Sequence, residues 1–318
     1  MLHKNTLFAA LPLAACVLFP IQGHAQEAEA SPPPPIPGNF RLSSGISYSL
    51  GDYGELEDTE VVAIPVSLSY SDSGFKLRVS VPYVYINGPG SLLSTPDGRD
   101  GGSGQGRGRG GDSGNSGPGS LNSGSGSSGS EVEVEDEAEE EVIDDDEIVG
   151  EDGVVPAADS RKGFGDVNVA LGYSVALGAT TWFEPEVKVK LPTASRAKRL
   201  GTGKMDVTAA ASLVQDVGPA TVYLSGRRKF AGKPEGSSIR STWGASAGAS
   251  MRAADGIAVG ADYDWQQSSF AGRQASSEVT GWTNFRLRQG LGLTAYAGTG
   301  FNDNSAKFFG GLSLSARF

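Results

Sequence analysis

The sequence predicts an all-β fold: an antiparallel, up-and-down transmembrane β-barrel of about twelve strands, interrupted by a disordered acidic extracellular insert. Three observations lead to this prediction. Apolar and polar residues alternate along many segments, short and long connections alternate between those segments, and the chain ends on an alternating segment that closes with an aromatic residue. A soluble β-sandwich is the alternative, but a sandwich has no reason to keep short and long connections in strict alternation.

The C-terminal segment 306–318 carries the clearest alternation. Leu312, Leu314 and Phe318 share one face, and Ser313 and Arg317 share the opposite face. This pattern resembles the closing strand of bacterial outer-membrane barrels. The resemblance implies that the barrel assembly machinery reads Phe318 as an assembly signal and that outer-membrane lipid surrounds the folded barrel.

Segments with the same alternation occupy much of the chain before this one. The expected strands are 38–50, 60–71, 74–87, 163–176, 180–192, 204–217, 219–231, 240–253, 256–268, 278–289, 291–301 and 305–318. A strand of about ten residues, tilted by about 40°, covers about 25 Å, which is the height of the apolar band of an outer-membrane barrel.

The connections between these strands alternate in length. Tight turns are expected at 71–74, 177–179, 216–219, 253–256 and 289–290. The longer connections between them are 51–59, 88–162, 193–203, 232–239 and 269–277, together with the shorter 302–304. This layout predicts that the tight turns and both chain ends lie on the periplasmic side and the long loops outside the cell.

Aromatic residues are expected to form a girdle at each membrane interface. Those assigned to periplasmic strand ends are Phe40, Tyr70, Phe75, Trp182 and Phe318. Those assigned to outer strand ends are Tyr48, Tyr85, Trp243, Trp265, Phe301 and Phe308.

The N-terminal segment has the features of a secretory signal peptide over residues 1–25, with an apolar run and small residues before an expected cleavage site after Ala25. A lipoprotein processing box that ends at Cys16 is the alternative. Residues 26–37 are expected to form a Pro-rich periplasmic tether, and residues 38–318 the barrel.

Removal of the signal peptide would take away the cysteine, Cys16, and both histidines, His3 and His24. The mature chain would then lack the side chains for Ser-His-Asp or Cys-His catalysis and for a zinc site built from His and Cys. We therefore expect no enzyme activity, no cofactor and no metal centre.

The insert at 88–162 interrupts the barrel pattern. Its first part, 101–130, is rich in Gly and Ser, and its second part, 131–152, is strongly acidic. Because such a composition cannot bury enough apolar surface to fold, the insert is expected to be disordered. Residues 88–160 carry 18 acidic side chains and 3 arginines, a net charge of about −15. Against the total of −11, the rest of the chain carries about +4, so the acidic balance belongs to the insert. The run Asp144 to Asp146 is expected to bind Ca²⁺ weakly at most, since the residues that follow do not continue an EF-hand pattern.

Three short motifs point to a family. They are Gly163-Phe164-Gly165-Asp166-Val167, Pro185-Glu186-Val187-Lys188-Val189-Lys190-Leu191-Pro192-Thr193 and Gly201-Thr202-Gly203-Lys204-Met205-Asp206. Together they resemble the outer-membrane family of transporters linked to the meta-pathway of phenol degradation. The resemblance covers 163–230 well and implies a twelve-stranded barrel that passes small aromatic or hydrophobic molecules. A phosphate loop at Gly201 to Lys204 is rejected, because the Walker spacing is absent; the glycines are expected to shape the end of a loop.

Charged residues recur on the polar faces of the strands, where a barrel would turn them toward its lumen. The candidates for the lumen and its selectivity are Asp166, Glu186, Lys188, Lys190, Asp206, Arg227, Lys229 and Arg286. We therefore predict a passive outer-membrane channel or uptake protein for small-molecule solutes, with no nucleic acid partner. The alternative is a surface-display or adhesion protein in which the acidic insert is the functional part and the barrel is its anchor.

One contact within this set can be predicted from strand order. Asp166, Lys190 and Asp206 lie at corresponding heights on neighbouring strands, so we expect them to form a cluster near the outer mouth. Two interpretations stay open: the charges satisfy one another and stiffen the wall, or they help to set charge selectivity.

Overall fold

The structure is a computed structural model that describes residues 39–53, 55, 57–89 and 160–318. The expected signal peptide, the Pro-rich tether, the Ca²⁺-binding run and nearly all of the acidic insert lie outside the described residues. In the described part of the chain, no helix is long and apolar enough to cross a membrane.

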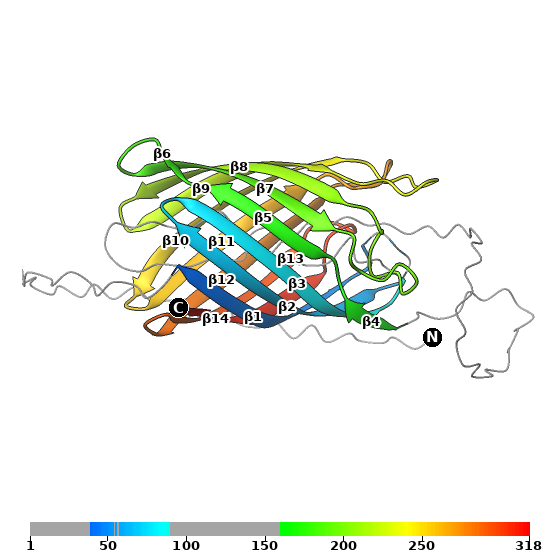
Figure 1. Cartoon of the computed structure of the whole chain (residues 1–318), viewed down its shortest axis with the longest axis horizontal. Helices are drawn as coiled ribbons and strands as arrows, with labels where there is room; N and C mark the ends of the chain where they lie inside the picture. The colour runs from blue at the N-terminus through cyan, green and yellow to red at the C-terminus, as the bar shows by residue number, and fades with distance from the viewer. Residues whose placement is uncertain (1–38, 54, 56, 90–159) are drawn as a thin grey trace, which may run out of the picture. The chain divides into compact units, whose positions relative to one another are not determined.

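The described residues from 39 to 318 form a closed antiparallel β-barrel of 12 strands, as the sequence predicts (Figure 1). The strand segments are β1 Phe40–Gly51, β2 Thr59–Asp72, β3 Phe75–Asn87, β4 Arg161–Phe164, β5 Val167–Tyr173, β6 Val175–Ala176, β7 Thr181–Leu191, β8 Asp206–Val217, β9 Ala220–Phe230, β10 Thr242–Ala254, β11 Ile257–Gln266, β12 Ser276–Arg288, β13 Leu291–Gly300 and β14 Phe308–Arg317. With β4, β5 and β6 counted as one barrel strand, each strand pairs antiparallel with its neighbours in sequence. Strand β1 pairs with β14 from Arg41 opposite Arg317 to Leu50 opposite Phe308, which closes the sheet.

The fourth barrel strand is broken, whereas the sequence pattern predicts one continuous strand over 163–176. Segments β4, β5 and β6 together occupy its place, since β4 and β5 both pair with β3, and β5 and β6 both pair with β7. At the first break the N–H of Gly165 donates to the carbonyl of Pro82, 2.8 Å away, and Asp166 leaves the ladder. The strand also begins earlier than expected, because Arg161 and Lys162 pair with Ile86 and Tyr85.

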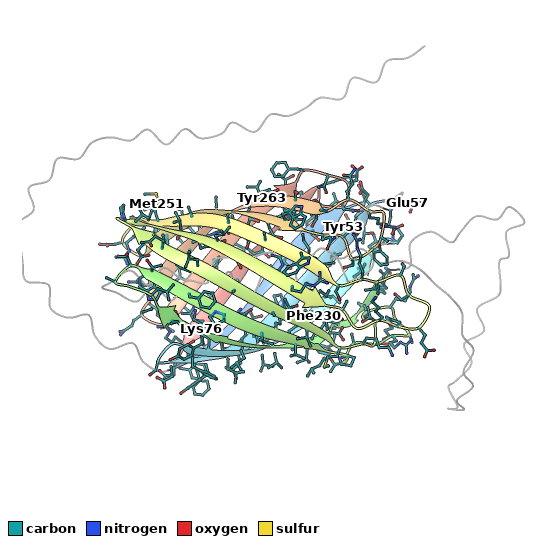
Figure 2. The ribbon with its side chains drawn as sticks, turned by 90° about the horizontal axis from the view of Figure 1, so that it is seen from above. Tyr53, Glu57, Lys76, Phe230, Met251 and Tyr263 are labelled. Atoms are coloured by element: carbon teal, nitrogen blue, oxygen red, sulfur yellow. The ribbon has the colours of Figure 1, made fainter. Side chains whose placement is uncertain are left out.

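The barrel has two different ends. At one, which we call the turn end, tight turns join the strands and the C-terminal Phe318 exchanges backbone hydrogen bonds of 3.0 and 3.1 Å with Phe40. The opposite end, the loop end, carries the longer connections. Lys76 and Met251 lie toward the turn end, and Phe230 toward the loop end (Figure 2).

Side chains alternate between an apolar exterior and a polar interior. The exposed exterior positions include Leu42 and Ile46 on β1, Leu224 on β9, and Leu312 and Leu314 on β14. Serines share the interior face: Ser43 and Ser67 are joined by a 2.8 Å hydrogen bond between their hydroxyl oxygens, and Ser212 donates to Ser225 at 3.0 Å.

Aromatic rings gather at the turn end, as predicted for four of five residues. The ring of Phe40 lies 5.0 Å from Tyr70 and 6.1 Å from Phe318, and Tyr70 lies 6.4 Å from Phe75. Trp182 is the exception: it shares the interior face of Glu184 on β7, and the neighbouring Phe183 is the exposed aromatic. The exterior aromatic position on β7 is therefore Phe183, one residue after the Trp182 that was expected in the girdle.

Apolar side chains fill part of the interior near the loop end. Ala194 and Leu200, from the connection between β7 and β8, are buried against the interior face of β2 and β3; the cluster is Val61, Ala63, Val84, Ile86, Ala194 and Leu200. A second cluster joins Tyr53, Ala306 and Phe309, with Tyr296 packed against them. The connections at this end therefore fold inward and narrow the lumen.

Candidate functional site

An ion cluster lies in the barrel interior at the loop end, on β7, β8, β9 and the break between β4 and β5. The ammonium of Lys190 lies 3.0 Å from a carboxylate oxygen of Asp166 and 3.3 Å from one of Asp206. Lys229 adds a second ammonium 3.4 Å from the same oxygen of Asp206. The predicted contacts of Lys190 are present, and Lys229 makes the cluster a balanced set of two acids and two bases.

The two carboxylates of this cluster also hold backbone. Asp166 accepts a 2.9 Å hydrogen bond from the N–H of Ala194, and Asp206 accepts one of 2.9 Å from the N–H of Gly232. Both acids are about 4% exposed. Because each acid fixes the start of a loop-end connection, the cluster couples the strands to the inward-folded loops.

The three motifs from the sequence converge on this cluster. Gly201 packs so tightly that an added Cβ would lie 2.8 Å from the side chain of Ala194 and 3.0 Å from the carboxylate of Asp166. Gly203 has a φ of +63°, a conformation that glycine adopts without strain. Thr202 accepts a 3.4 Å hydrogen bond from Lys190. The expectation that these glycines shape a loop end is confirmed.

A second polar group bridges strands β9 and β11 across β10. The guanidinium of Arg227 makes two hydrogen bonds to the carboxylate of Asp264, at 2.7 and 2.8 Å, and one to Gln266 at 2.9 Å. Nearer the turn end, Asp262 accepts hydrogen bonds from the hydroxyl of Tyr223 and, at 2.8 Å, from the indole of Trp282.

Glycines on β10 make these bridges possible. A Cβ at Gly244 would lie 2.6 Å from the Arg227 guanidinium carbon, and one at Gly248 would clash with Asp262 and Tyr223. The side chains of β9 therefore cross directly over the backbone of β10 to reach β11.

The remaining sequence candidates lie on the same interior surface but apart from these groups. Glu186 and Lys188 lie on the face of β7 that carries Lys190, and both are half-buried. Arg286 lies far from the ion cluster, at the turn end of β12. The structure thus divides the candidate residues between two ends of the lumen.

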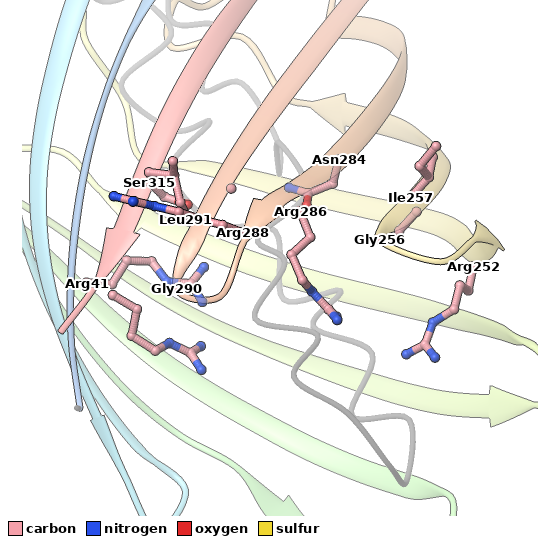
Figure 3. Close-up of a pocket in the computed structure, with 13 residues that line it drawn as sticks. Arg41, Arg252, Gly256, Ile257, Asn284, Arg286, Arg288, Gly290, Leu291 and Ser315 are labelled. Carbon is pink, nitrogen blue, oxygen red and sulfur yellow. The ribbon is translucent and has the colours of Figure 1, made fainter. Parts of the chain in front are cut away.

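An open pocket lies in the barrel interior at the turn end (Figure 3). Five arginines line it: Arg41, Arg252, Arg286, Arg288 and Arg317. Figure 3 shows Arg252 and Arg286 extending from their strands into the interior. We call this group the turn-end pocket.

Sequence reasoning missed two parts of this arrangement. The buried Tyr223 and Trp282 were not singled out, although both lie on strands whose neighbouring interior positions are polar. Arg41 was missed as well, and the convergence of five arginines depends on the closure of β1 onto β14. Placement on alternate strand positions could have included Arg41, but it could not have shown which arginines meet.

Comparisons with known proteins identify the fold. No family model matches this sequence, and no curated protein matches it. The crystal structure of an outer membrane channel from Pseudomonas putida F1 is similar with a TM-score of 0.54 at 13% identity, over 92% of this chain and all of that one. The KdgM porin has a TM-score of 0.45 at 8% identity, over 87% of this chain and 99% of that one. The CymD monoaromatic hydrocarbon channel has a TM-score of 0.41 at 10% identity, over 88% of this chain and 90% of that one.

The location follows from the exterior of the barrel. Aliphatic and aromatic side chains stay exposed all around the sheet, and the pairing of β1 with β14 closes it, as a hydrocarbon environment requires. The protein is a barrel of the bacterial outer membrane.

Proposed function

We propose that this protein is an outer-membrane channel or uptake protein for small solutes, which pass through a narrow, charged lumen. The observation that carries the proposal is the interior surface itself. Charged side chains line it from the ion cluster of Lys190 at the loop end to the turn-end pocket around Arg286. A barrel that served only as an anchor would have no need for a charged path along its axis.

The solute class rests on the sequence motifs. The motifs around Asp166, Lys190 and Asp206 resemble a family of transporters for small aromatic or hydrophobic compounds. We include such compounds in the proposal. The inward-folded loops, with Leu200 buried against β2 and β3, support a path for small molecules.

Single-channel recording on the refolded full chain tests the proposal. The wild-type barrel should give discrete current steps in a planar bilayer, and Leu200→Asp should enlarge them, because a carboxylate cannot stay buried in the apolar cluster that holds the loop. Phe183→Tyr, at an exposed exterior position, serves as the control and should leave the steps unchanged.

The alternative function predicts a different result. If neither the wild type nor Leu200→Asp conducts, although both migrate as folded barrels, the lumen is closed. The barrel would then be an anchor, and the acidic insert would become the candidate for function.

A further inference from the structure

Strand β9 carries a run of basic residues near the loop end, Arg227, Arg228 and Lys229. Because side chains alternate along a strand, Arg227 and Lys229 point into the barrel, where each pairs with a carboxylate. Arg228 therefore lies on the opposite face, which it shares with the exposed Leu224 and Phe230. This is the face that meets lipid, so β9 presents a cation to the membrane.

Two aromatic rings hold the guanidinium of Arg228 on that face. Its central carbon lies 4.9 Å from the ring centre of Trp243 and 5.8 Å from that of Phe230. Trp243 is directly opposite Arg228 on β10 and is 57% exposed, and Phe230 lies toward the loop end (Figure 2). A cation within about 6 Å of an aromatic ring is attracted by it, so the rings keep the guanidinium beside the barrel wall.

These rings also indicate the depth of Arg228 in the membrane. Exposed aromatic side chains near strand ends mark the level at which hydrocarbon meets the lipid headgroups. Arg228 lies two residues before the end of β9 and at the level of Trp243. A cation in the middle of the lipid face would destabilise the barrel strongly, whereas at this level it costs little and meets the headgroups.

We propose that the surface around Arg228 binds a phosphorylated glycolipid of the outer leaflet, of the lipid A class. A guanidinium keeps its charge at physiological pH and offers N–H donors in a planar fork that matches the oxygens of a phosphate. The inference takes the loop end as the outer end of the barrel, as the layout of turns and loops predicts. It goes beyond the proposed function, because it does not depend on conduction through the lumen.

A second cation lies beyond Arg228 at the rim of the barrel. An added Cβ at Gly232, two residues after Phe230, would lie 2.7 Å from the Cβ of Lys204, so Lys204 sits beside the continuation of β9. Lys204 is exposed, and the connection between β7 and β8 that contains it carries no acid. Three more exposed cations belong to the same connection: Arg196, Lys198 and Arg199. A cation at the lipid level followed by cations at the rim suits a headgroup that carries more than one phosphate.

The basic connection is held by its own contacts. Ala194 and Leu200 are buried in the interior cluster, and the N–H of Leu200 donates a 3.0 Å hydrogen bond to the carbonyl of Ser195. The N–H of Arg199 donates one of 2.8 Å to the carbonyl of Arg196. The apolar side chains therefore anchor the connection inside the barrel while the basic ones stay exposed. Because the turn is already formed, a bound headgroup does not have to order it, which favours binding.

Native mass spectrometry of the full chain, folded in a non-ionic detergent, tests the inference with diphosphorylated lipid A as the probe. The wild type should retain lipid A as a discrete adduct. Arg228→Gln should weaken this binding at least about tenfold, because it removes a charge-assisted contact to phosphate. Lys162→Gln is the matched control: Lys162 is an exposed cation on the exterior face of β4, opposite Tyr85, and its loss should leave the affinity unchanged.

Two further probes separate the phosphate from the rest of the lipid. Lipid A without its phosphate groups should bind much more weakly than the diphosphorylated form, and so should phosphatidylglycerol, an anionic phospholipid. If Arg228→Gln does not fold, Lys204→Gln takes its place, and weaker binding of lipid A is again expected. The inference would be overturned if the folded wild type bound no lipid A, if Lys162→Gln weakened binding as much as Arg228→Gln, or if phosphatidylglycerol or dephosphorylated lipid A bound equally well.

Discussion

Substitution of Asp206 by Asn distinguishes the two interpretations of the loop-end ion cluster. In the wild type, Asp206 faces two ammonium groups, those of Lys190 at 3.3 Å and Lys229 at 3.4 Å. Asn keeps the shape of the side chain and can still accept the hydrogen bond from the N–H of Gly232. The substitution therefore removes the charge and little else.

The expected cost follows from burial. Two unit charges 3.3 Å apart attract by about 5 kcal/mol at an effective dielectric constant of about 20. Part of this is lost to desolvation, and removing one partner of a buried pair typically costs about 3–5 kcal/mol. In this variant Lys190 keeps its ion pair with Asp166, but Lys229 loses its ion pair with Asp206. We therefore expect Asp206→Asn to destabilise the barrel by about 3 kcal/mol.

Urea unfolding in lipid vesicles, followed by tryptophan fluorescence, measures this loss, and the reversal potential in a salt gradient measures selectivity. Glu186→Gln is the matched control, because it removes one interior carboxylate for which the described chain shows no ion pair. It should cost less than about 1 kcal/mol. If the cluster is structural, Asp206→Asn should leave the reversal potential within the scatter of the wild type.

A selective filter would behave in the opposite way. The reversal potential of Asp206→Asn would shift toward anions while stability barely changed. That result would refute the structural interpretation. A variant that altered neither quantity would show that the contacts of Asp206 with both lysines do not form in the membrane.

Three further outcomes are expected. Gly244→Val should break the bridge between Arg227 and Asp264, and urea unfolding should show a loss of about 2 kcal/mol or more, because the guanidinium crosses directly over this glycine. Replacing 95–155 by a short Gly/Ser linker should leave the heat-modifiable migration of the folded barrel intact; failure to insert would make the segment structural. Deleting Phe318 should slow assembly in cells more than refolding into detergent, as pulse-chase and refolding kinetics would show, whereas equal slowing would indicate ordinary packing.

Most of the fold was predictable because a lipid-facing strand has a strict period of two. The alternation around Leu312 and Leu314 fixes both the strand and its outward face. The break in the fourth strand was not predictable, since it depends on a contact between Gly165 and Pro82 from another strand. No local pattern in 163–176 signals such a contact.

The candidate site was predictable only in part. Neighbouring strands place Asp166, Lys190 and Asp206 at one height, so their contact could be predicted from order and period alone. The burial of Leu200 could not, because a single apolar residue in a loop has no periodicity. The roles of these residues in selectivity, and of Phe318 in assembly, stay predictions.

The pairing of β3 with β4 has a consequence for the length of the chain between them. Arg161 pairs with Ile86 and donates a 2.9 Å hydrogen bond to the carbonyl of Gly88, 73 residues away in sequence. The entropy lost on closing a flexible loop grows only with the logarithm of its length, by about 0.6 kcal/mol for each doubling. Lengthening this connection from about ten residues to its present size would therefore cost about 2 kcal/mol. Four residue pairs between β3 and β4 and the hydrogen bond of Arg161 hold the ends of the connection together. The length and sequence of the connection can therefore change in evolution with little loss of barrel stability.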